Sequence, residues 1–210
     1  YGGVNGTLTW PAGTSGARDI VIPIVDDNVD EVSKLFQVVL SGATARAVIA
    51  DPVVDVTIVD DDTVVVDVAA SLAFLEGAGS VPAVNVTLTG SSEETISVVY
   101  ATSDGTAFSP GDYGFVTGTI VWLPGETGTK TVLVSLVDDV ADESNEVFTV
   151  RLSAPVVASI GRAIGTVEIV DDDTSQLSIG DVTVVEDLGI VTVNVTLNTP
   201  SASFVTVEYM

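Results

Sequence analysis

The 210-residue sequence contains no cysteine and no histidine, and only six lysine and arginine residues stand against 30 aspartate and glutamate residues. Without cysteine and histidine there are no disulfides, no catalytic systems built on a histidine base, and no zinc site with nitrogen and sulfur ligands. The formal net charge of −24 repels phosphates, which excludes nucleic acid as a partner and disfavours anionic membranes. Stability must therefore come from packing or from bound ions.

Long hydrophobic runs are also missing. No stretch approaches the roughly 18 consecutive apolar residues that suggest a membrane-spanning helix, so we expect no insertion into a bilayer. A chain with so many carboxylates would ordinarily be disordered, but 46% of its residues are hydrophobic and its mean hydropathy is +0.52. These values predict a folded chain with an apolar core.

The sequence repeats itself with a period of roughly 110 residues. Residues 6–11 recur at 118–124, residues 59–63 recur at 170–174, and residues 85–88 recur at 194–197. The matches divide the chain into the C-terminal part of a first repeat (1–62), a complete repeat (63–173) and the N-terminal part of a third repeat (174–210).

The two ends of the chain carry complementary parts of the repeat. Residues 174–210 correspond to the early strands of a repeat, and residues 1–62 correspond to its late strands. This arrangement is expected of a piece of a longer array. The alternative hypothesis is that the partial repeats complete a sandwich by pairing their edge strands, within one chain or between neighbouring copies.

Apolar and polar residues alternate with a period of two at residues 131–137, 147–153 and 166–170, which is typical of strands with one buried face. Turn dipeptides at 104–105, 110–111 and 124–125 separate the apolar runs. About seven strands in about 110 residues, with no helical period, predict an all-β fold of tandem immunoglobulin-like two-sheet antiparallel sandwiches. Trp10 and Trp122 occupy equivalent positions, and we expect both in the core.

The acidic residues of the complete repeat gather where the predicted strands begin or end. They are Glu76, Asp112, Asp138, Asp139, Glu143, Glu146, Asp171, Asp172 and Asp173. If these strand ends meet at one pole of the sandwich, the carboxylates repel one another and destabilise the fold unless cations neutralise them. Oxygen ligands without nitrogen or sulfur favour Ca²⁺, and so many carboxylates suit more than one ion per repeat. Solubilising loops at strand ends are the alternative explanation.

Four motifs in this order resemble the Calx-beta family. They are residues 103–107 followed by 111–113, residues 118–122 followed by 124–126, residues 137–139 followed by Glu143, Glu146 and Phe148, and residues 166–173. The family consists of calcium-binding sandwiches found in sodium–calcium exchangers, in an integrin subunit and in many long surface proteins. The resemblance covers essentially all of the chain, and it implies that the nine carboxylates are calcium ligands.

The resemblance also implies calcium ligands in the two partial repeats. These are Asp26, Asp27, Glu31, Asp60, Asp61 and Asp62 in the first repeat, and Glu186 in the third. The first repeat departs from the family pattern, because Lys34 stands where Glu146 stands in the complete repeat. The position that matches Asp112 would precede Tyr1. An ammonium group in place of a ligand repels the metal, so we expect the first site to bind fewer ions or to bind them more weakly.

Three classes of function are compatible with these observations. The leading hypothesis is a calcium-binding structural or adhesive module of an extracellular or cell-surface protein, in which Ca²⁺ neutralises acidic poles and stiffens the junctions between repeats. The alternative is a calcium-sensing regulatory domain, as in sodium–calcium exchangers. A glycosidase with two catalytic carboxylates is the third class, but the repeat already accounts for the carboxylates, so we expect no enzyme. The expected partners are calcium, neighbouring repeats and other copies of the chain.

Overall fold

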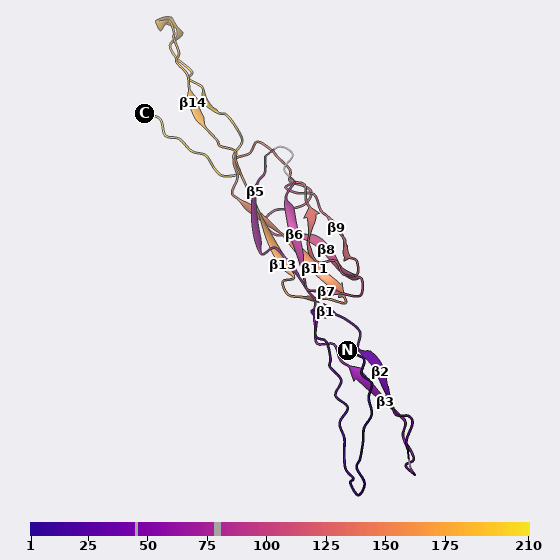
Figure 1. The fold of residues 1–210 in the computed structure, drawn as a ribbon. Helices are drawn as coiled ribbons and strands as arrows, with labels where there is room; N and C mark the ends of the chain where they lie inside the picture. The colour runs from indigo at the N-terminus through magenta and orange to yellow at the C-terminus, as the bar shows by residue number, and fades with distance from the viewer. Residues whose placement is uncertain (45, 78–80) are drawn as a thin grey trace.

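The structure is a computed structural model that describes residues 1–44, 46–77 and 81–210. A central body of β-strands carries one extended arm at each end, and the N-terminal arm and the C-terminal arm point in opposite directions (Figure 1). The central body corresponds to the complete repeat, and the arms correspond to the partial repeats. No helix among the described residues has the length and apolar character needed to cross a bilayer.

The central body is a sandwich of two sheets. The four-stranded sheet has the order β10-β6-β4-β12, and the five-stranded sheet has the order β5-β13-β11-β8-β9. The strands of the first sheet are β4 (Val65–Val68), β6 (Ala83–Thr89), β10 (Gly128–Leu133) and β12 (Ser159–Ile160). Those of the second are β5 (Ser71–Leu75), β8 (Ile96–Asp104), β9 (Thr117–Trp122), β11 (Glu146–Val156) and β13 (Ile164–Val170). The predicted all-β sandwich is confirmed.

The core lies between the two sheets and follows the period-two alternation of the sequence. In β6, every second residue is buried, and the intervening residues are mostly exposed. Trp122, Tyr113 and Phe148 are fully buried, and the rings of Tyr113 and Phe148 are stacked with centroids 4.2 Å apart. Residues that sit far apart in the chain therefore form one contiguous apolar cluster, whose burial stabilises the sandwich.

The sequence predicts antiparallel strand pairs throughout, but two pairs of the sandwich are parallel. β5 pairs with β13 in parallel, and β12 pairs with β4 in parallel. The first part of the repeat switches from one sheet to the other, because β4 belongs to the four-stranded sheet and β5 to the five-stranded one. Since β5 and β13 run in the same direction, the residues that follow them, Glu76 and Asp171, emerge at the same pole.

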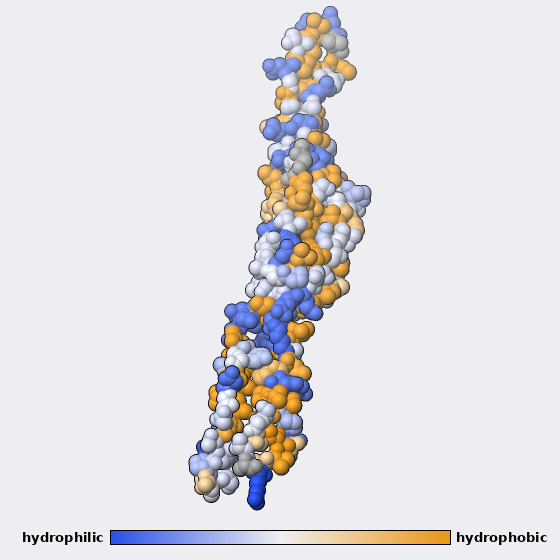
Figure 2. All heavy atoms as spheres, turned by 45° about the vertical axis from the view of Figure 1, so that its right-hand side comes forward, coloured by the Kyte–Doolittle hydropathy of each residue, from blue (hydrophilic) through white to orange (hydrophobic). Residues whose placement is uncertain are grey.

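Each arm contains only part of a sandwich. The N-terminal arm pairs β2 (Lys34–Val39) with β3 (Val53–Ile58), and the short β1 (Val29–Asp30) pairs with β7 (Ser91–Ser92) of the central repeat. The C-terminal arm pairs β14 (Leu177–Ile179) with β15 (Val195–Leu197), and a 3₁₀ helix, η1 (Glu186–Leu188), lies between them in sequence. Figure 2 shows many hydrophobic residues exposed along both arms.

The prediction that Trp10 is a core residue is wrong for this chain. Trp10 is 45% exposed, whereas its equivalent Trp122 is 0% exposed. Both indole N–H groups still make the same local hydrogen bond, to the carbonyl of Gly16 at 2.9 Å and to that of Gly128 at 3.2 Å. The turn geometry is thus encoded locally, but burial requires an opposing sheet that residues 1–62 do not contain.

The two partial repeats do not complete each other within one molecule. They lie at opposite ends of the central sandwich, and among the described strands none of residues 1–62 pairs with any of residues 174–210. Completion by a neighbouring copy stays a prediction.

Candidate functional site: an acidic pole at the end of the sandwich

Four segments of the complete repeat deliver carboxylates to one end of the sandwich. Glu76 follows β5, residues 171–173 follow β13, Glu146 begins β11, and Asp112 lies in the loop between β8 and β9. The parallel ladder of β5 and β13 extends by one more hydrogen bond, from the amide of Glu76 to the carbonyl of Val170 at 3.1 Å. This bond sets Glu76 beside the first residue of the aspartate run.

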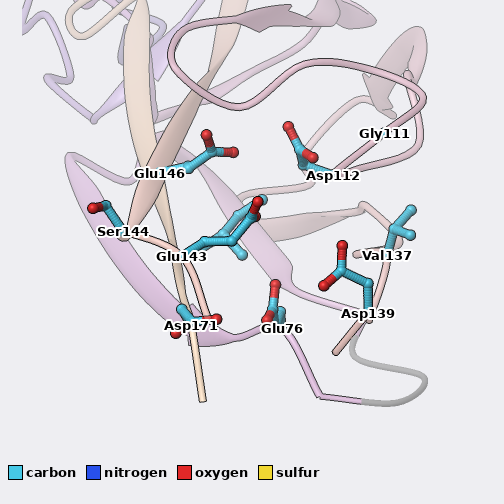
Figure 3. Close-up of a pocket in the computed structure, with 10 residues that line it drawn as sticks. Glu76, Gly111, Asp112, Val137, Asp139, Glu143, Ser144, Glu146 and Asp171 are labelled. Atoms are coloured by element: carbon cyan, nitrogen blue, oxygen red, sulfur yellow. The ribbon is translucent and has the colours of Figure 1, made fainter. Parts of the chain in front are cut away.

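A small pocket opens between these segments, and Figure 3 shows carboxylate groups around it. Six of the nine predicted ligands line the pocket; they are Glu76, Asp112, Asp139, Glu143, Glu146 and Asp171. The enclosed space is about 10 Å³, close to that of a single water-sized sphere.

The remaining three predicted ligands lie at the outer side of the same pole. Asp173 belongs to a group in which one carboxylate oxygen each from Glu76, Asp139 and Asp173 lies within 4.8 Å of the others. Asp138 and Asp172 are exposed, and both act electrostatically on Asp173. The fold thus brings all nine residues to one end of the sandwich.

Two carboxylate oxygens at the pole are buried without any hydrogen-bond partner. They are Oε1 of Glu76 and Oδ1 of Asp171. The Glu76 side chain is the most enclosed carboxylate of the chain, because the residue is only 8% exposed. Burying an unpaired anionic oxygen is costly, and such oxygens are normally satisfied by a hydrogen bond or by a cation.

The same crowding changes the acidity of the pole. The pKa of Glu76 is raised to about 7, mainly by burial and secondly by the neighbouring Asp171 carboxylate. Burial, followed by the Asp112 carboxylate, raises the pKa of Glu146 to about 7. Burial and the surrounding aspartates also raise the pKa values of Glu143 and Asp173. In each case burial disfavours the charged form first, and repulsion by neighbouring carboxylates adds to it.

The residues present fit a calcium ion. All side-chain donors at the pole are oxygens, several come from loops, and two of them are buried and unpaired, which suits the six to eight oxygen ligands that Ca²⁺ takes in variable geometry. When bound, the ion would supply the positive charge that the pole lacks.

Neighbouring groups hold the ligand loop of Asp112 in place. Oδ2 of Asp112 accepts a hydrogen bond from the amide of Phe108 at 2.6 Å. Asp104 accepts from the hydroxyl of Tyr113 at 2.5 Å and from the amide of Ser109 at 3.1 Å, so Asp104 anchors this loop to the core. The sequence places Asp104 in a turn dipeptide; in the structure it is the last residue of β8, directly before that turn.

The first partial repeat has its own acidic cluster. All six residues predicted there, Asp26, Asp27, Glu31, Asp60, Asp61 and Asp62, line one open pocket. Lys34 lies in the same pocket and forms an ion pair with Glu31. Burial and then the other four aspartates raise the pKa of Asp62. The lysine therefore already supplies one positive charge inside this cluster.

Glu186 is the one predicted ligand of the third repeat, and it lies apart from both clusters. It is exposed at the start of η1, in the outer part of the C-terminal arm. The strand ends that would surround it in a complete repeat fall outside residues 174–210.

Two residues at the repeat junctions were not singled out from the sequence. Asp142 bonds to the third repeat, with its Oδ2 accepting from the amide of Ser175 at 3.0 Å. Glu93 lies 3.3 Å from the ammonium of Lys34, across the first junction. The 112-residue spacing between Asp30 and Asp142 could have identified the junction position, but nothing in the sequence pairs Lys34 with Glu93.

Comparison with known proteins identifies the family of the chain. The sequence model of the Calx-beta domain matches residues 1–62, 60–173 and 170–210. The chain is 38% identical over 94 residues to sodium/calcium exchanger 1 of Canis lupus familiaris, which is 45% of this chain and 10% of the exchanger. It is 42% identical over 83 residues to sodium/calcium exchanger 3 of Homo sapiens, which is 40% of this chain and 9% of the exchanger. The chain thus spans about a tenth of these relatives.

Among solved structures, the apo form of the Calx CBD1 domain is 27% identical, with a TM-score of 0.48; the match covers 53% of this chain and all of that domain. The family match extends over all three segments into which the sequence repeats itself. The chain belongs to the Calx-beta domain family.

Proposed function

We propose that this chain is a calcium-binding regulatory module of a longer protein, in which loading of the acidic pole changes how firmly successive repeats are held together. The observation that carries the proposal is the pair of buried, unpaired oxygens on Glu76 and Asp171, in a pocket lined by six carboxylates. A cation that satisfies both oxygens stabilises the folded state by mass action, because the unfolded chain does not assemble the pole.

The loop between Leu136 and Glu146 connects the pole to the next repeat. It carries predicted ligands on both sides of Asp142, whose amide donates to the carbonyl of Pro200 at 3.0 Å. Ligands that converge on an ion restrict the loop, and a restricted loop holds the following repeat more firmly. The calcium state of one repeat is thereby communicated to its neighbour.

The regulatory role is favoured over the adhesive one by the kind of relative that the chain resembles, since both named relatives are sodium/calcium exchangers. A structural or adhesive role at the cell surface is the second candidate, and it is supported by the tandem arrangement of repeats. The two roles differ in affinity, because calcium sensors bind at about 10⁻⁷ to 10⁻⁵ M and extracellular modules at about 10⁻⁴ to 10⁻³ M.

Calorimetric titration of the chain with CaCl₂, combined with thermal melts in calcium and in chelator, tests the proposal. We expect a higher melting temperature in calcium, with stabilisation of about 2.7 kcal/mol at a hundredfold excess of free calcium over the Kd. MgCl₂ at the same ionic strength is the control, and it should stabilise less. An unchanged melting temperature in calcium would overturn the proposal, and a millimolar Kd would favour the structural role.

A further inference from the structure

The same backbone contact joins each repeat to the next one. At the first junction, the carbonyl of Asp30 accepts from the amide of Glu93 at 3.1 Å and from the hydroxyl of Ser92 at 2.9 Å. Oγ of Ser92 accepts in turn from the amide of Glu94 at 3.1 Å. Ser92 is 1% exposed, so this contact is buried between the repeats.

The second junction repeats this arrangement with the equivalent residues. The carbonyl of Asp142 accepts from the amide of Ala202 at 3.0 Å and from the hydroxyl of Ser201 at 3.5 Å. Oγ of Ser201 accepts from the amide of Ser203 at 3.2 Å. Asp142 also pairs with Ser201 in parallel, as Asp30 pairs with Ser92. The same contact, with a serine hydroxyl at equivalent positions, therefore forms at both junctions.

The side chains beside the contact differ in a matched way. At the first junction the ammonium of Lys34 lies 3.3 Å from the Glu93 carboxylate of the following repeat. At the second junction the equivalent residues are Glu146 and Ala202. The two positions thus carry a lysine and a glutamate at the first junction, and a glutamate and an uncharged alanine at the second. Neither junction has like charges at both positions.

We propose that Lys34 and Glu93 form an ionic latch between repeats, and that the residues at these two positions determine which repeat fits after which. The lysine holds its neighbour without added metal, whereas Glu146 lines the acidic pocket and the matching position of the following repeat is the uncharged Ala202. A repeat that ends in Glu146 would repel a following repeat that carries Glu93. The expectation that calcium affects the second junction rests on the proposed function. The ion pair between Lys34 and Glu93 at the first junction does not.

Amide hydrogen exchange measured by NMR reports each junction separately, because the amides of Glu93 and Ala202 make equivalent bonds across the two junctions. In chelator and at low salt, we expect Lys34→Met and Glu93→Gln each to speed exchange at the Glu93 amide about two- to fivefold, which is the range for an exposed ion pair. The double variant should change it no further, and about 1 M salt should remove the difference.

Glu94→Gln is the matched control, because it removes the same charge from the next residue and leaves the latch intact. The latch is overturned if Glu94→Gln has the same effect as Glu93→Gln, or if neither latch variant alters exchange at Glu93. Exchange at Ala202 gives an independent outcome: we expect calcium to slow it in every variant. If calcium leaves Ala202 unchanged while the latch variants act on Glu93, the proposed function fails and the latch stands.

Discussion

At the scale of single residues, Glu76 is the centre of the site because three features coincide there. Its side chain is nearly enclosed, one of its oxygens has no hydrogen-bond partner, and its pKa is raised to about 7. Each feature disfavours the charged form in the apo protein. The residue therefore weakens the apo fold and gains the most from a bound cation.

Replacing Glu76 separates these two effects. We expect Glu76→Gln to raise the melting temperature of the apo protein by a few degrees, because the amide buries no charge, and to remove most of the stabilisation by calcium. Thermal melts in chelator and in calcium measure both changes. Glu126→Gln is the control, since Glu126 lies in the turn after β9, on the far side of the sandwich, and pairs with Lys130. A variant that keeps the full calcium response would contradict the assignment of Glu76.

The raised pKa values also predict how pH acts on the apo protein. Glu76 and Glu146 titrate near pH 7 in the folded state and near 4.5 when unfolded, so the folded state holds more protons between these values. Their contribution to the free energy of unfolding is therefore lost as pH rises through this window. Calcium competes with the same protons, so calcium affinity should rise over that window.

Urea denaturation in chelator and calcium titrations, both at a series of pH values, measure these trends. The double variant Glu76→Gln, Glu146→Gln should flatten the pH dependence of apo stability. A calcium affinity that stays constant from about pH 6 to about pH 8, one unit on each side of the folded pKa, would contradict the prediction.

At the scale of elements, the position of the opposing sheet decides what a strand buries. Trp10 and Trp122 have similar local sequences and equivalent indole hydrogen bonds, yet only Trp122 lies between two sheets. The alternation of a strand predicts which face is apolar, but it does not supply a partner for that face.

The two tryptophans make a matched pair for mutation. We expect Trp122→Ala to lower the free energy of unfolding by about 3–5 kcal/mol, as large-to-small changes in a packed core do. Trp10→Ala should cost less than about 1 kcal/mol, because the side chain is half-exposed. Urea denaturation of each variant in calcium measures the difference. Equal losses of unfolding free energy in the two variants would mean that Trp10 is buried in solution. A second copy that completes the N-terminal arm would bury it in this way.

At the scale of the whole molecule, the acidic pole and the repeat junction share one loop. Much of the net charge of −24 comes from the acidic residues of the two clusters. Figure 2 shows hydrophilic residues gathered where the N-terminal arm meets the central sandwich. Neutralising a pole therefore changes both the stability of a repeat and the hold on its neighbour.

Asp142 provides the test of that coupling. We expect Asp142→Ala to leave the calcium affinity of the pole within about threefold, because its carboxylate bonds to Ser175, and to weaken the junction with the third segment. Small-angle scattering in calcium should then show a broader distribution of distances than the native chain in calcium, as we also expect of the native chain in chelator. Asp142→Asn retains a hydrogen-bond acceptor and is the control. Identical scattering curves for all three proteins would argue against coupling through this loop.

The sequence by itself determined the all-β fold, the repeat and the membership of the acidic pole, because alternation, period and residue type are local properties that survive in every repeat. It could not determine which carboxylates are buried, since the enclosure of Glu76 and Asp171 depends on a parallel pairing between strands almost 100 residues apart in the chain.

Tertiary structure alone decided the contacts between repeats. The pairing of Lys34 with Glu93 joins residues 59 positions apart, and no periodicity relates them. The same lysine looked like a defect in a metal site when only the aligned repeats were considered. Its neighbours in space give it a second role, because a charge is stabilised or opposed by whatever the fold places within a few ångströms of it.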